Sequence, residues 1–204
     1  MAASRTMERP APAASRGFTM LEVLISILII VLGLLGLAGM QAVAQQAELE
    51  SYQRAQALVL LSDMVDSING NRGSAGCFAF TTQSDGTPYA GTTTGGGYLG
   101  TANCGTGFLN SQTKAMVDGL VTTWDQHLQG SAETASGGAA IGAMIGARGC
   151  VSYDSTMQIY TVIVTWQGMT DTFAPVKNCA NGKYGAETKR RAVWTTIQIA
   201  NLSG

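Results

Sequence analysis

The stretch that decides the fold runs from residue 16 to residue 47 and reads RGFTMLEVLISILIIVLGLLGLAGMQAVAQQA. Residues 23–40 are apolar except for Ser26, and Glu22 is the one acid in the stretch. A helix over these eighteen residues would be roughly 27 Å long, close to the hydrocarbon thickness of a bilayer. We therefore predict a transmembrane helix over about residues 20–43.

Glu22 is out of place in such a helix. A carboxylate at the mouth of a membrane span costs several kcal/mol unless it is paired or lies at the interface. Cleavage of the peptide bond between Gly17 and Phe18 would leave a new amino group on Phe18, four residues before the acid. An amine of this kind is the partner that Glu22 needs.

Residues 17–26, GFTMLEVLIS, resemble the class III signal of type IV pilins and type II secretion pseudopilins. In that family a prepilin peptidase cuts after the glycine on the cytoplasmic side and methylates the new N-terminus. The resemblance implies cleavage between Gly17 and Phe18 and N-methylation of Phe18. It also implies that Glu22 pairs with the N-terminus of a neighbouring subunit during assembly.

Residues 1–17 are then a leader peptide that the prepilin peptidase removes. The leader has three arginines and one glutamate, so the positive-inside rule places it in the cytoplasm and the C-terminus in the periplasm. Either Met1 or Met7 could be the true start. The alternative is a conventional secretory signal cut after Ala44, but its apolar run would be unusually long and Glu22 would weaken it.

Three glycines, Gly33, Gly36 and Gly39, interrupt the apolar run. Small residues allow helices to pack closely, and each interior glycine also weakens a helix by about 1 kcal/mol relative to alanine. Many pilins of the family carry a helix-breaking proline in this part of the helix, and this chain has none there. We hypothesise that these glycines let the helix stretch or melt in a filament. A filament helix protected from hydrogen exchange across them would refute this.

Downstream of Ala47 the apolar residues recur at helical spacing. The stripe that we expect a globular head to bury consists of Leu49, Tyr52, Ala55, Val59, Leu61, Met64, Val65 and Ile68. Asn69, Gly70 and Asn71 should end the helix, with Gly70 in the left-handed position. The prediction is one long helix over residues 18–69.

Residues 70–204 should form the globular head. Residues 71–112 are rich in glycine, threonine and serine and are predicted to be a long loop, the αβ-loop. A short helix is expected over residues 113–129. Strands are expected over residues 148–153, 157–167 and 190–200, in an antiparallel sheet that covers about residues 139–200. The fold class is therefore α+β, with the pilin arrangement of a long helix packed on an antiparallel sheet.

Four cysteines follow the apolar run. An even number in an oxidising compartment predicts two disulfides, for which three pairings exist. We favour Cys77–Cys104 and Cys150–Cys179, because each then closes one local loop, and each would add about 2–4 kcal/mol. Free buried cysteines are the alternative.

Composition and motifs argue against other function classes. Charged residues make up 12% of the chain and the net charge is −1, so we expect no nucleic-acid partner. Residues 95–100 match G-x-G-x-x-G, but neither a strand nor a helix flanks them. His127 is the single histidine. We expect no catalytic residue, no cofactor and no metal site.

The C-terminal pieces YTVIVTWQG and KRRAVWTTIQI, with the leader motif, resemble the PilV-type minor pilins of type IV pili. The resemblance implies a structural protein that helps to initiate pilus assembly in a tip-associated complex. Its partners would be the prepilin peptidase, other minor pilins, the major pilin, the inner-membrane assembly platform and a tip adhesin. It would reside in the inner membrane before assembly and in the extracellular filament afterwards. A type II secretion pseudopilin is the first alternative, and a conventionally secreted binding module or enzyme is the second.

Overall fold

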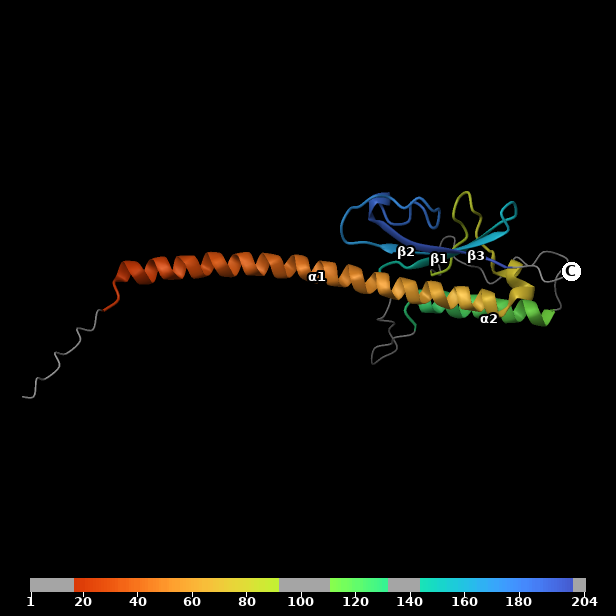
Figure 1. Cartoon of the computed structure of the whole chain (residues 1–204), viewed down its shortest axis with the longest axis horizontal. Helices are drawn as coiled ribbons and strands as arrows, with labels where there is room; N and C mark the ends of the chain where they lie inside the picture. Colours follow the sequence, from red (N-terminus) through yellow and green to blue (C-terminus); the bar gives the residue numbers. More distant parts are fainter. Residues whose placement is uncertain (1–16, 92–110, 132–143, 200–204) are drawn as a thin grey trace, which may run out of the picture. The chain divides into compact units, whose positions relative to one another are not determined.

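The computed structural model describes residues 17–91, 111–131 and 144–199. The chain divides into two compact units, residues 1–45 and residues 46–204. Helix α1 (Met20–Gly70) begins in the first unit and ends in the second. Figure 1 shows the order of the elements along the chain.

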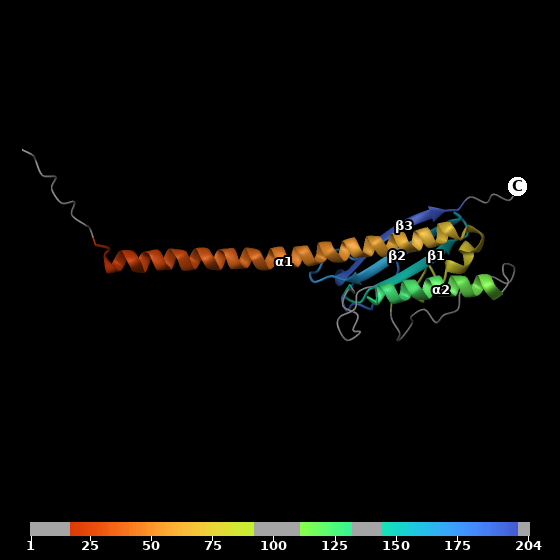
Figure 2. The same ribbon diagram turned by 90° about the horizontal axis from the view of Figure 1, so that it is seen from below.

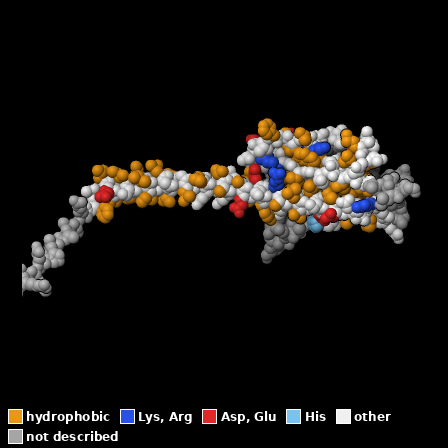
Figure 3. All heavy atoms as spheres, in the orientation of Figure 1, with side chains coloured by type: hydrophobic (Ala, Val, Ile, Leu, Met, Phe, Trp, Pro, Cys, Tyr) orange, Lys and Arg blue, Asp and Glu red, His pale blue; other side chains and the backbone are white. Residues whose placement is uncertain are grey.

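The first unit, as far as it is described, is the N-terminal part of α1 and the short segment before it. Thr19 starts the helix: its carbonyl oxygen accepts hydrogen bonds from the Glu22 and Val23 N–H groups. The side chains of residues 17–45 are all exposed, and hydrophobic side chains cover this part of the helix (Figure 3). The helix is long and apolar enough to cross a membrane, with a mean hydropathy of 2.8 over its most apolar window.

The second unit is a three-stranded antiparallel sheet with two helices against one face (Figures 1 and 2). The strands are β1 (Arg148–Asp154), β2 (Ile159–Gln167) and β3 (Arg190–Gln198), in the order β1-β2-β3. The C-terminal part of α1 and helix α2 (Ser111–Leu128) cover the face. The α+β prediction is confirmed, and the predicted strands and short helix match these elements within about two residues.

The core between the helices and the sheet buries a stripe of α1 that agrees with the predicted one only in its second half. The buried residues are Gln53, Ala57, Leu61, Met64 and Ile68. Tyr52 is 51% exposed, and Leu49, Ala55 and Val59 also face outward, so the first half of the predicted stripe is wrong. The helix carries two apolar stripes roughly 130° apart, and the sheet covers only one of them.

Trp124 of α2 contacts both α1 and the sheet. Its side chain is buried, and its Nε1 donates a hydrogen bond of 2.8 Å to the carbonyl oxygen of Leu60 in α1. A Cβ atom on Gly149 of β1 would lie 2.1 Å from the indole ring. Glycine is therefore required at this position of the strand, because any side chain would displace the tryptophan.

Two loops cover the other face of the sheet. The hydrophobic cluster between these loops and the sheet contains Tyr89, Cys150, Ile163, Cys179, Ala180 and Tyr184. Arg148 stacks over two of these rings, at 5.4 Å from Tyr89 and 4.6 Å from Tyr184. Both faces of β2 are therefore buried, which explains why both sides of this strand carry residues that favour sheets.

Several predicted boundaries are corrected. Gly70 is the last residue of α1 and does not adopt a positive φ angle. Residues 71–91 are not simply loop, since they contain the 3-10 helix η1 (Arg72–Phe78) and a bridge between Thr82 and Thr87. Ser74, Ala75, Cys77 and Phe78 of η1 are buried in the head. The described sheet begins at Arg148, and residues 139–143 lie outside the described ranges.

Candidate processing and assembly site

The Gly17–Phe18 peptide bond lies just before α1, in a segment without helical structure. The Phe18 side chain is 83% exposed. A Cβ atom on Gly17 would meet no heavy atom within 4 Å. Among the described residues, nothing packs against this bond, and an exposed bond of this kind is what a peptidase requires of its substrate.

Glu22 lies in the first turn of α1. Its N–H also approaches the Thr19 side-chain oxygen at 3.3 Å, and its carbonyl oxygen accepts a 2.7 Å hydrogen bond from Ser26 Oγ. Within residues 17–91, 111–131 and 144–199, its carboxylate has no hydrogen-bond or ion-pair partner. An acid at a helix N-terminus is compatible with the helix dipole, and here it is also free to bind a cation from another molecule.

The three glycines of the apolar run lie within a continuous stretch of α1. Ideal Cβ atoms on Gly33, Gly36 and Gly39 would meet no atom within 4 Å. No contact with the part of the chain that the structure describes therefore requires a glycine at these positions. Their role in helix flexibility stays a prediction.

A family model matches residues 12–38, which include Gly17, Phe18 and Glu22. This chain carries a prokaryotic N-terminal methylation motif. The motif supports a type IV pilin-like or pseudopilin-like protein that a prepilin peptidase processes and that plays a structural role. With the exposed apolar helix, it also fits anchoring in a membrane before assembly. The comparisons with curated proteins and with solved structures gave no match.

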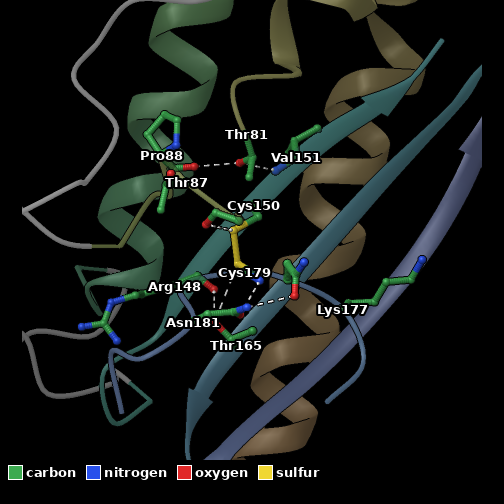
Figure 4. The surroundings of a disulfide bond; sticks show 12 residues. Thr81, Thr87, Pro88, Arg148, Cys150, Val151, Thr165, Lys177, Cys179 and Asn181 are labelled. Atoms are coloured by element: carbon green, nitrogen blue, oxygen red, sulfur yellow. Dashed lines mark hydrogen bonds between the residues drawn. A yellow bond between two sulfur atoms is a disulfide. The ribbon is translucent and has the colours of Figure 1, made fainter. Parts of the chain in front are cut away.

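A disulfide joins Cys150 of β1 to Cys179, with Cα atoms 5.9 Å apart (Figure 4). It is one of the two pairings favoured from the sequence, and it fastens the connection between β2 and β3 to the sheet. Next to it, the Val151 N–H donates to Thr81 Oγ1, and Thr81 Oγ1 donates to the carbonyl oxygen of Pro88. The favoured Cys77–Cys104 pairing falls partly outside the described residues, because Cys104 is not among them.

Glu50 of α1 holds the start of the β2–β3 connection. Its Oε1 accepts hydrogen bonds from the N–H of Met169 at 3.1 Å, from Thr170 Oγ1 at 3.1 Å and from Arg191 at 3.3 Å. Burial raises the pKa of Glu50, but the hydrogen bonds from Thr170 and Met169 and the charge of Arg191 outweigh it. The pKa therefore lies below its ordinary value of 4.5.

We expect acid to loosen this contact. Because the folded pKa of Glu50 is lowered, its stabilising effect is present above about pH 4.5 and is lost as the pH falls through the folded pKa. Hydrogen-exchange protection factors of the Met169 and Thr170 amides should decrease over that range. In the variant Glu50→Gln, protection should be lower at neutral pH and should change little with acid. Equal acid responses in both proteins would contradict the assignment.

The sequence analysis missed Glu50, Arg190 and Arg191 as positioning residues. Arg190 is 2% exposed. The available signal was the pair of arginines at the start of a strand, but the burial of Arg190 could not be predicted from it.

His127 lies 3.6 Å from Asp63, with both side chains partly exposed. Among the described residues, no group of three or more potential ligands could hold a metal ion.

Proposed function

We propose that this protein is a PilV-type minor pilin that helps to initiate type IV pilus assembly. The observation that carries the proposal is the methylation motif over residues 12–38, with Gly17, Phe18 and Glu22 in the positions of the cleavage site and the assembly acid. The C-terminal resemblance favours a minor pilin over other members of the family. The proposed partners are the other minor pilins, the major pilin, the assembly platform and a tip adhesin.

The proposed mechanism is structural. The leader, residues 1–17, stays in the cytoplasm, the apolar part of α1 holds the precursor in the inner membrane, and the C-terminus is periplasmic. Cleavage releases the Phe18 amine. In the assembling bundle, the Glu22 carboxylate pairs with the amine of a neighbouring subunit, where the low dielectric constant strengthens the attraction. This contact fixes the axial position of one subunit relative to the next.

Mass spectrometry of the mature protein tests the processing step. The expected N-terminal residue is N-methylated Phe18, released from a chain that was expressed with its prepilin peptidase. A mature protein that begins at Gln45 would instead show conventional secretion after Ala44. An uncleaved chain in the presence of active peptidase would contradict the assignment of Gly17 and Phe18.

A type II secretion pseudopilin is the second candidate, because the methylation motif is common to both classes. Deletion of the gene separates them. Loss of surface pili with normal export of secreted enzymes supports the minor pilin. Normal piliation with loss of enzyme export would favour the pseudopilin.

A further inference from the structure

Several apolar side chains in the connection between β2 and β3 are exposed and take no part in the core of the head. Phe173 is 99% exposed and Val176 is 81% exposed, and Met169 is exposed as well. We refer to residues 168–178 as the β2–β3 loop. Neither the N-terminal processing site nor the sheet core uses these three side chains.

Hydrogen bonds hold this loop in place on both sides of Phe173. The Thr172 N–H donates to the carbonyl oxygen of Thr188 at 2.8 Å, and Thr188 Oγ1 donates to Asp171 at 2.7 Å. On the other side, the buried Arg190 guanidinium donates to the carbonyl oxygens of Lys177, at 2.8 Å, and Pro175, at 3.2 Å. The exposure of Phe173 is therefore imposed by a fixed backbone.

The same contacts place the loop at one end of the head. Met169 and Thr170, near the start of the loop, donate hydrogen bonds to Glu50, which is the fifth residue of the second unit. The turn between β1 and β2, which carries the exposed Met157, lies at the opposite end of the sheet, because Gln167 pairs with Arg190 and Ile159 with Gln198. The loop is thus at the end where the chain enters the head from the apolar stretch.

The apolar stretch is joined to this end of the head by a short length of chain. Six residues lie between Val43, near the end of the predicted span, and Glu50, so this length of chain spans at most roughly 25 Å. The polar interfacial layer of one leaflet is about 5–8 Å thick. The tether is long enough for the loop to reach this layer, and apolar side chains such as phenylalanine are stabilised when they enter it.

We propose that the β2–β3 loop docks on the lipid surface of the membrane that holds α1, with Phe173 and Val176 entering the interface. The inference rests on the proposed membrane-anchored precursor. Tethering by α1 gives the loop a high effective concentration at the lipid surface, which a diffusing protein partner lacks. The loop carries one acid, Asp171, and one base, Lys177, so apolar contact drives docking and anionic lipid is not required. Docking orients the head of the precursor, and extraction into a filament breaks it.

Fluorescence quenching by lipid tests this docking. The full chain is reconstituted in phosphatidylcholine vesicles, with or without bromine on the acyl chain near the headgroup. Phe173→Trp and Val176→Trp report on the loop, and Met157→Trp, 64% exposed at the other end of the sheet, is the matched control. The three native tryptophans give the same background in each variant. We expect brominated lipid to reduce the emission of the two loop reporters and to leave that of the control unchanged.

Flotation of the vesicles separates the two proposals. A chain that does not float with lipid contradicts membrane anchoring and the docking together. A chain that floats, but whose loop reporters are no more quenched than the control, overturns the docking alone. Quenching by brominated lipid that is lost at low protein-to-lipid ratio shows that lipid contact requires association between copies of the chain, and it overturns docking of the single subunit. In the V176W protein, Phe173→Ala should weaken docking about tenfold or more, measured as lost quenching.

Discussion

Replacing Glu22 with alanine should prevent assembly of this subunit into filaments while cleavage between Gly17 and Phe18 continues. In the single chain the carboxylate has no partner among the described residues, so its removal costs the precursor little. In the proposed filament it faces the amine of a neighbour in an apolar bundle. Removing one member of such a buried pair typically costs about 3–5 kcal/mol, which weakens association by a hundredfold or more.

The measurement is the amount of this subunit in sheared pili, compared with the amount of cleaved precursor in the membrane. Glu22→Gln keeps the size of the side chain and removes its charge, so it should fail like Glu22→Ala. Ser26→Ala removes only a hydrogen bond to the Glu22 carbonyl oxygen and should assemble normally. Normal incorporation of Glu22→Ala would refute the pairing, and loss of cleavage would show that Glu22 acts in processing.

The proposed processing and assembly residues can be recognised in the sequence because their pattern is local. Gly17, Phe18 and Glu22 lie within six residues, and their spacing is itself the signal. Glu50 is different, because its partners Thr170 and Arg191 are 120 and 141 residues away. Contacts of that kind exist only after the sheet has formed, so no local pattern identifies them.

The same distinction applies to the fold. Alternation along β2 predicted a buried strand because it depends only on neighbouring residues. The face of α1 that the head buries could not be predicted in this way, because Tyr52 and Ala57 belong to two different apolar stripes of the helix. The sheet selects the stripe that contains Ala57 and the polar Gln53, whereas hydropathy alone favours the stripe that contains Leu49 and Val59. Tertiary packing thus overrides a helical pattern that is correct in period.

Replacing Trp124 with alanine should strongly destabilise the head. The indole is 1% exposed, bonds to Leu60 of α1 and fills the space above Gly149 of β1. Its removal leaves a cavity where α1, α2 and the sheet meet. Substitutions of this type cost about 3–5 kcal/mol, a large part of the roughly 5–15 kcal/mol that stabilises a typical domain. Urea unfolding of the full chain in detergent, followed by circular dichroism, measures the loss.

Two further variants separate packing from the hydrogen bond. Trp124→Phe keeps one six-membered ring and loses the donor to Leu60 together with the rest of the indole, so its cost should exceed the about 1 kcal/mol of the hydrogen bond and stay below that of Trp124→Ala. Trp194→Ala, at a tryptophan that is 43% exposed on β3, should cost less than Trp124→Ala because little buried volume is removed. If Trp194→Ala and Trp124→Ala destabilise the head equally, then Trp124 does not join its layers. A loss in Trp124→Phe as large as in Trp124→Ala would assign the stabilisation to the hydrogen bond with α1 instead of to the packing of the ring.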